Sequence, residues 1–145
     1  MEAQHAYQII ELLKGVVDQG TAMRLRFRYK FRNEIGGKTG TTQNQSDGWF
    51  IGVTPELVTG VWVGASDRRV HFRSIKYGQG ANMALPIWAL YMKSVFADNR
   101  INMTKVRFEK PEGFNINLNC TTVKEKKEEE IKSTPTADDF DQFDG

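Results

Sequence analysis

Cysteine and histidine are scarce in this sequence of 145 residues: Cys120 is the only cysteine, and His5 and His71 are the only histidines. A single cysteine excludes an internal disulfide and a cysteine-based metal cluster. Two histidines with scattered acidic residues offer too few ligands for a metal site. The sequence therefore predicts neither a metal nor a cofactor.

Long apolar runs are also absent. No stretch of about 20 apolar residues is present, and the first residues, MEAQHAYQII, have neither the basic start nor the apolar middle of a secretory signal. We therefore expect no transmembrane or signal segment within these residues. A length of 145 residues fits one modest domain.

The formal net charge of +2 hides an uneven distribution. Residues 124–145 carry four lysines and eight acidic residues, so this tail has a net charge of −4 and the preceding residues have a net charge of +6. The tail has too few apolar groups to offset the entropy of ordering. We predict a body over residues 1–110 and an extension with a disordered acidic tail over residues 111–145. An alternative role for the tail is a partner-binding motif around Phe140 and Phe143.

Hydrophobic periodicity predicts an α+β fold. Apolar residues at helical spacing over residues 4–18 and 81–96 indicate two helices that pack on a core. The chain between them has the pattern of three antiparallel strands, over residues 38–42, 49–53 and 57–65. A Thr-Pro turn joins the second strand to the third. Because these two strands are apolar on both faces, we expect helices to cover both sides of the sheet.

Residues 24–32 alternate between basic and apolar side chains. Arginine or lysine occupies every even position, and leucine, phenylalanine or tyrosine occupies every odd one. Period two predicts an extended, half-buried segment with one basic face. Basic residues interleaved with aromatic ones also suggest nucleic-acid binding. The aromatic rings would face away from the arginines, however, which favours a sheet edge or loop.

The stretch Gly37-Lys38-Thr39 first suggests a phosphate-binding P-loop. That motif requires a glycine five positions before Gly37, where this sequence has Arg32, and a helix after the lysine, where Gly40 and two threonines predict a strand. The residues instead match the Lys-Thr-Gly triad of active-serine penicillin-interacting enzymes. On a strand, Lys38 supplies positive potential, the Thr39 hydroxyl can bond a carboxylate, and Gly40 leaves room for an acyl chain. The next N–H, on Thr41, can point at a developing oxyanion.

The match extends beyond three letters, over GKTGTTQNQSDGWFIGVTPELVTGVWVGA and then GQGANMALPIW. These stretches strongly resemble the C-terminal part of the transpeptidase domain of class A, bifunctional penicillin-binding proteins. The resemblance covers roughly residues 5–97. It implies the active-serine penicillin-binding/β-lactamase-like transpeptidase fold. The matching positions outside the triad are Asp47, Trp49, Phe50, Gly52, Thr54, Pro55, Val58 to Gly64, Ala84, Pro86, Ile87 and Trp88.

The resemblance implies cross-linking of bacterial cell-wall peptidoglycan, with stem peptides ending in D-Ala-D-Ala as substrates and β-lactams as their mimics. It gives Lys38 a role in the positive field of the cleft, and Thr39 and Thr41 a role in holding the terminal carboxylate. The Thr41 N–H would supply half of the oxyanion hole. Gly40 and Thr42 complete the candidate substrate-binding set. The parent protein would be bound to the bacterial inner membrane, with this region in the periplasm or extracytoplasmic space.

Catalysis in this family also needs a Ser-x-x-Lys nucleophile motif and a Ser-x-Asn motif. None of the five serines is followed three residues on by lysine or two residues on by asparagine. Without the nucleophile no acyl-enzyme forms. We therefore expect a C-terminal fragment of a transpeptidase, inactive alone, whose partner is the remaining part of the domain. Two alternatives remain: a non-catalytic binding module that kept the carboxylate-gripping strand, and a basic nucleic-acid binder through residues 24–32.

Overall fold

The computed structural model describes residues 2–101, 103 and 106–116. The chain divides into two compact units, Met1–Glu112 and Gly113–Gly145, and the helices and strands of the described residues belong to the first. The predicted acidic tail lies outside the described residues. None of the helices in the described part of the chain has the length and apolarity needed to cross a membrane.

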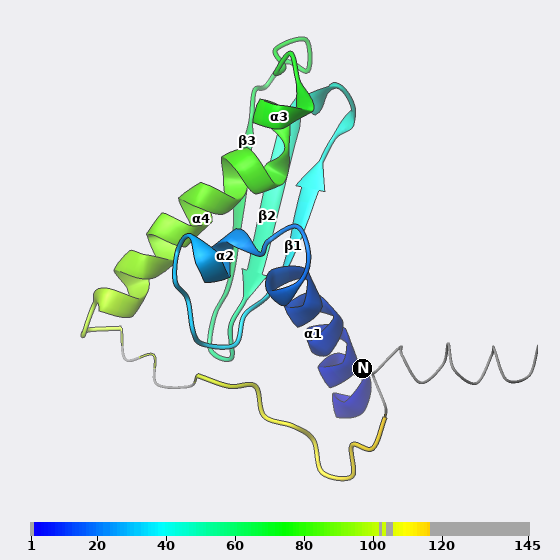
Figure 1. The fold of residues 1–145 in the computed structure, drawn as a ribbon, viewed down its shortest axis with the longest axis vertical. Coiled ribbons are helices and arrows are strands. Elements are labelled where there is room, and N and C mark those ends of the chain that lie inside the picture. Colours follow the sequence, from blue (N-terminus) through cyan, green and yellow to red (C-terminus); the bar gives the residue numbers. More distant parts are fainter. Residues whose placement is uncertain (1, 102, 104–105, 117–145) are drawn as a thin grey trace, which may run out of the picture. The chain divides into compact units, whose positions relative to one another are not determined.

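Three strands form an antiparallel sheet in the order β1-β2-β3 (Figure 1). Their bounds are Gly36–Thr41 for β1, Asp47–Val53 for β2 and Val58–Gly64 for β3. Thr54 closes the turn between β2 and β3, since its N–H donates to the Leu57 carbonyl at 2.8 Å and its Oγ1 accepts the Leu57 N–H at 3.1 Å. The predicted α+β fold with three antiparallel strands is therefore confirmed.

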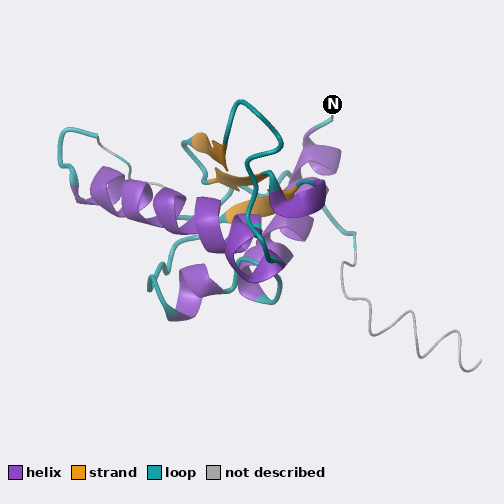
Figure 2. Ribbon diagram, turned by 90° about the horizontal axis from the view of Figure 1, so that it is seen from above, coloured by secondary structure: helices purple, strands orange, loops and turns teal. Residues whose placement is uncertain are grey.

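Two long helices flank the strands in the sequence. They are α1, Ala3–Asp18, and α4, Gly80–Ala97, close to their predicted bounds. α1 packs against β1, whereas α4 contacts all three strands. Figure 2 shows α4 running along one side of the strands. The sequence pattern missed three short elements: α2 (Arg24–Phe27), the 3₁₀ turn η1 (Gln43–Gln45) and α3 (Ile75–Gly78).

Trp88 of α4 is the largest fully buried side chain. Its ring packs edge-on against Phe50 of β2, with 5.2 Å between ring centroids, and its Nε1–H donates to Thr59 Oγ1 of β3 at 2.6 Å. A side chain at Gly52 would overlap the indole ring, so the glycine is what allows α4 to lie this close to the sheet. The sheet thus buries the apolar surface of the indole and accepts the hydrogen bond from its N–H.

The prediction of an extended segment over residues 24–32 was wrong. Residues Arg24–Phe27 form α2, and Lys30 adopts a left-handed backbone conformation with φ of 63°. Local bonds hold this loop: the Phe31 N–H donates to the Leu25 carbonyl at 3.0 Å, and Arg26 Nη1 donates to the carbonyls of Phe31 and Asn33 at 3.2 and 2.7 Å. An extended chain would need a neighbouring strand for its backbone groups, and these local partners take that place.

The expectation that helices cover both faces of the sheet was also wrong for the described residues. Trp49, Ile51, Val58 and Trp62 lie on the face opposite α4, and each is between 45% and 64% exposed. Trp49 is therefore not a core residue in this chain. Apolar side chains on a strand indicate that a face can be buried. They cannot show whether the same chain or a different chain buries it.

A half-buried ion pair fixes the chain just before β1. Lys14 of α1 donates to Glu34 Oε1 at 3.0 Å, and the Phe108 N–H donates to Glu34 Oε2 at 2.9 Å. Burial by itself raises the pKa of Glu34, but the Phe108 N–H and the Lys14 ammonium outweigh it and hold the pKa below its ordinary value. Burial likewise lowers the pKa of Lys14, and its hydrogen bonds to Glu11 and Glu34 raise it to a greater total extent.

Candidate functional site

Strand β1 presents the Lys-Thr-Gly residues on two different faces. Lys38 lies opposite Ile51 and Gly40 opposite Trp49, on the exposed face of the sheet, whereas Thr39 lies opposite Phe50 on the face that α4 covers. Successive side chains of a strand alternate between faces, so one residue of the triad cannot share a face with the next. The Lys38 ammonium and the Thr39 hydroxyl therefore lie on opposite faces of the sheet. One ligand can reach both only at the free edge of β1, which is the long side of the strand that does not pair with β2.

That free edge is the outer side of β1. Among the described residues β1 pairs with β2 alone. The Thr42 N–H donates to the Asp47 carbonyl at 3.1 Å, so it points toward β2. N–H groups of consecutive strand residues point to opposite sides, so the N–H groups of Thr39 and Thr41 point away from β2. The edge therefore offers two backbone donors in the spacing that an added extended peptide requires.

Lys38 reaches the same edge. Its Nζ donates to the Thr39 carbonyl at 2.7 Å, and that carbonyl points outward together with the Thr39 N–H. The ammonium is exposed, and no carboxylate of the described residues pairs with it. One unpaired positive charge therefore stands beside two outward N–H groups, an arrangement that attracts an anionic group.

The two threonine hydroxyls have partners from elements far along the chain. Thr39 Oγ1 lies 3.0 Å from Thr21 Oγ1, in the turn that follows α1. Thr41 Oγ1 accepts the Gly80 N–H, at the start of α4, at 2.9 Å. A hydroxyl has one donor and two acceptor positions, so the Thr41 O–H can still donate to another group while it accepts from Gly80. The same bond fixes the start of α4 against β1.

Thr42 is placed differently from the other candidate site residues. Its Oγ1 accepts the Asp47 N–H at 3.1 Å and lies 3.0 Å from Ser46 Oγ. The N–H and hydroxyl of Thr42 are thus both engaged in the turn between β1 and β2. The structure brings Lys38 to Thr41 together at the edge and gives Thr42 the role of holding the turn.

Gly80 packs directly on the strands behind the edge. A side chain at this position would overlap the carbonyl oxygen of Gly40 and lie 2.6 Å from that of Trp49. Arg24 adds a second tie, since its Nη1 donates to the Ala81 carbonyl at 3.0 Å. The start of α4 is therefore held both by α2 and by β1, the strand that carries the Lys-Thr-Gly residues.

Sequence reasoning assigned no role to Thr21 or Gly80, and it placed Arg24 on a basic face without its bond to the start of α4. The glycine was visible as part of GQG, but its contact with a strand residue 39 positions earlier depends on tertiary packing, which no local pattern encodes. Among the described serines, Ser46 is the only buried one, and its Oγ lies 3.0 Å from Thr42 Oγ1 in the turn between β1 and β2. The absence of a Ser-x-x-Lys motif is read directly from the sequence, and the structure does not bear on it.

The sequence has relatives among characterised proteins, although no protein-family model matches it. It is 41% identical to penicillin-binding protein 1A of Rickettsia bellii over 97 residues, which are 67% of this chain and 12% of that protein. It is 42% identical to penicillin-binding protein 1A of Aquifex aeolicus over 87 residues, and 38% identical to that of Pseudomonas aeruginosa over 99 residues. These alignments cover 59% and 68% of this chain and 11% of each relative.

The fold has a solved counterpart. The crystal structure of penicillin-binding protein 1A from Haemophilus influenzae superimposes with a TM-score of 0.64 at 28% identity, over 77% of this chain and 17% of that one. The chain spans only 11–12% of the length of the relatives above. Sequence and fold agree, and the chain belongs to the family of class A penicillin-binding proteins, in which it matches a part of penicillin-binding protein 1A.

Proposed function

We propose that this chain forms the Lys-Thr-Gly wall of the active site of a peptidoglycan D,D-transpeptidase. The observation that carries the proposal is the free edge of β1, where the outward N–H groups of Thr39 and Thr41 stand beside the unpaired Lys38 ammonium. A stem peptide that ends in D-Ala-D-Ala is extended and carries a terminal carboxylate. Both features suit a strand edge with one positive charge.

Each site residue has a role that its position supports. The Lys38 ammonium attracts the terminal carboxylate, and the hydroxyls of Thr39 and Thr41 donate to it. The Thr41 N–H stabilises the oxyanion that forms when a serine attacks the penultimate D-Ala carbonyl. Gly40 has no side chain on the exposed face, which leaves room for the peptide. Thr42 supports the edge indirectly, through the turn to β2.

The reaction needs a nucleophile from outside this sequence. In the proposed reaction a serine oxygen forms an ester with the penultimate D-Ala, the terminal D-Ala leaves as a free amine, and an amine of a second stem peptide then takes the acyl group. The partner that supplies this serine is the remaining part of the transpeptidase domain. The apolar face that carries Trp49, Ile51 and Trp62 offers that partner a surface to cover. The site would lie on the extracytoplasmic side of the bacterial inner membrane.

The first test is an NMR titration of the full chain with a peptide ending in D-Ala-D-Ala. We expect the largest shifts at the amides of Thr39 and Thr41, since these N–H groups face the edge. Lys38→Gln should weaken binding about tenfold because the carboxylate loses its charged partner. Lys76→Gln, a charge removed from α3, should leave it unchanged within about twofold. A titration without shifts at the edge would eliminate the proposal, and L-Ala-L-Ala serves as the stereochemical control.

The second test is labelling with a fluorescent penicillin. The chain alone should form no covalent adduct, and an adduct should appear when the remaining part of the domain is present. A covalent adduct on the isolated chain would contradict the proposal. Peptide binding together with no adduct in either state would favour a non-catalytic binding module. Nucleic-acid binding through residues 24–32 is less favoured, because two of its five cations, Arg24 and Arg26, are engaged in internal hydrogen bonds.

A further inference from the structure

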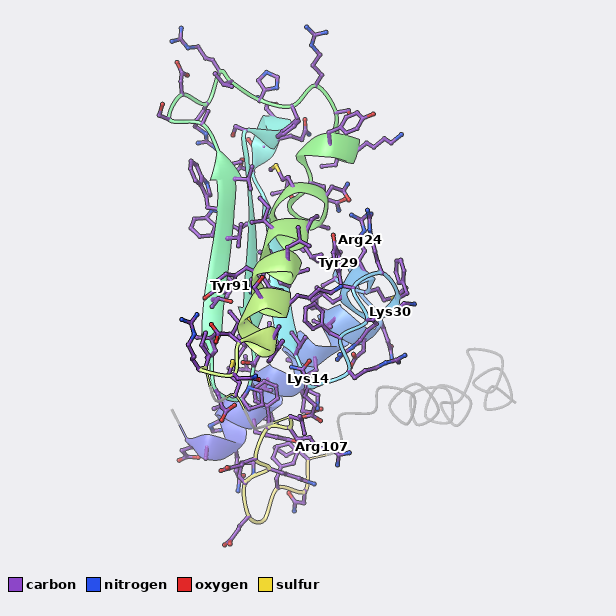
Figure 3. The ribbon with its side chains drawn as sticks, turned by 90° about the vertical axis from the view of Figure 1, so that its left-hand side faces the viewer. Lys14, Arg24, Tyr29, Lys30, Tyr91 and Arg107 are labelled. Carbon is purple, nitrogen blue, oxygen red and sulfur yellow. The ribbon has the colours of Figure 1, made fainter. Side chains whose placement is uncertain are left out.

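An open cavity of about 460 Å³ lies between the loop that precedes β1 and the last turns of α4. Three basic residues line it: Lys30 and Arg32 from the loop, and Lys93 from α4. Figure 3 shows Tyr29 and Lys30 on the loop beside this helix. Neither the Lys-Thr-Gly residues nor any group in the proposed transpeptidase site lines this cavity.

The three cations have no counter-charge from the residues that the structure describes. In the described part of the chain, none of Lys30, Arg32 and Lys93 forms an ion pair with a carboxylate. Lys93 instead lies over the Tyr29 ring, 5.8 Å from its centroid, and the Arg28 guanidinium lies 5.9 Å from the same centroid. The cavity therefore concentrates positive charge around an aromatic ring, which favours an anionic ligand.

The rest of the lining is apolar, with one unsatisfied donor. Phe31, Phe96, Ala97 and Met103 supply the apolar surface. Asn33 also lines the cavity, and its Nδ2 is buried with no hydrogen-bond partner among the described residues. Because this nitrogen has no exposed surface, a ligand in the cavity would be held by the cations and the apolar side chains and not by Asn33.

We propose that this cavity binds an acidic peptide segment that carries an aromatic side chain, contributed by a partner protein. The cations bind carboxylates of the segment, and the aromatic side chain enters the cavity against Phe31, Phe96 and Met103. A free phosphate would use the cations and leave the apolar surface unused. A membrane surface is flat, whereas this surface is concave. Positive charges around an apolar hollow therefore favour an acidic peptide with an aromatic side chain over a free phosphate or a membrane surface.

The test uses the full chain and a fluorescent peptide of sequence Asp-Glu-Phe-Asp-Glu, followed by fluorescence anisotropy. We expect saturable binding that weakens as NaCl is raised from about 50 to 500 mM, because the contacts are charged. Replacing the phenylalanine of the probe by alanine should weaken binding about tenfold, and an uncharged Asn-Gln-Phe-Asn-Gln probe should not bind. Vesicles of anionic phospholipid and inorganic phosphate are offered as competitors, and neither should displace the peptide.

Two matched triple variants separate a built site from bulk charge. Lys30→Asn with Arg32→Gln and Lys93→Gln should weaken binding at least about 30-fold, with asparagine chosen because it tolerates the left-handed backbone at this position. Arg68→Gln with Arg73→Gln and Lys76→Gln removes the same charge from α3 and the loop before it, none of which lines the cavity, and should change binding less than about twofold. Equal loss in both variants, absence of binding, or displacement by vesicles or phosphate would overturn the proposal.

Discussion

Replacing Gly80 by alanine tests how closely α4 must approach the Lys-Thr-Gly strand. Alanine is the better helix former by up to about 1 kcal/mol, so propensity alone predicts a more stable protein. The added methyl group would, however, overlap the Gly40 carbonyl and crowd that of Trp49, and backbone atoms cannot move aside as a side chain can. Overpacking of this kind costs about 1–3 kcal/mol. Displacement of the helix start also breaks the Gly80 N–H bond to Thr41, worth about 1 kcal/mol. We therefore expect a net loss of about 1–3 kcal/mol.

Gly15 provides the matched control, since it is also a helical glycine. Nothing lies within 4 Å of a side chain built there, so Gly15→Ala should stabilise the protein by about 0.5–1 kcal/mol. Urea unfolding followed by tryptophan fluorescence measures both variants, with the m-value checked for constancy. Opposite signs for the two substitutions are the prediction. A Gly80→Ala protein as stable as the wild type would refute the close packing, and so would a destabilised Gly15→Ala protein.

Three further predictions concern the ion pair, the buried indole and the uncovered face. Glu34→Gln should cost about 1–2 kcal/mol near pH 7. Because the folded state lowers the pKa of this carboxyl, the wild-type advantage is fully present above the ordinary value of 4.5 and is lost progressively as the pH of urea titrations falls through the lowered, folded-state pKa. A difference that does not shrink as the pH is lowered below 4.5 would contradict this assignment. Thr59→Val should cost about 1–3 kcal/mol in urea unfolding by leaving the Trp88 N–H buried without an acceptor, and no loss in the same variant would show that the indole has another partner. Acrylamide should quench Trp49 and Trp62, which are 45% and 46% exposed, and leave Trp88 shielded, as single-tryptophan variants can verify; equal quenching of all three would disprove the arrangement of the two sheet faces.

The sequence predicts the long, strongly periodic elements well. The bounds of α1 and α4 agree with the apolar spacing to within one residue, and the family resemblance is confirmed by the relatives and the solved fold. The alternation over residues 24–32 misled because a strand needs a partner for its backbone, and in this chain internal hydrogen bonds replace that partner. The division between residues 110 and 111 stays a prediction.

For the candidate site too, the sequence predicts the local features but not the tertiary contacts. A strand over Lys38 to Thr41 follows from the motif, and its hydroxyls and N–H groups follow from the residue types. The partners of those hydroxyls, Thr21 and Gly80, come from opposite sides along the chain and could be found only from the structure. The roles of the site residues remain proposals for the titration to decide.

The free edge of β1 owes its geometry to groups within this chain. The ladder to β2 sets the direction of the Thr41 N–H, and Thr41 Oγ1 and Thr39 Oγ1 are held by Gly80 and Thr21. None of these constraints involves the segment that would supply a serine. The donors are therefore oriented before a peptide arrives, so little ordering entropy opposes binding at the edge. What a second segment must add for the proposed reaction is the nucleophile and a cover for the apolar face, because the direction of the edge donors is already fixed.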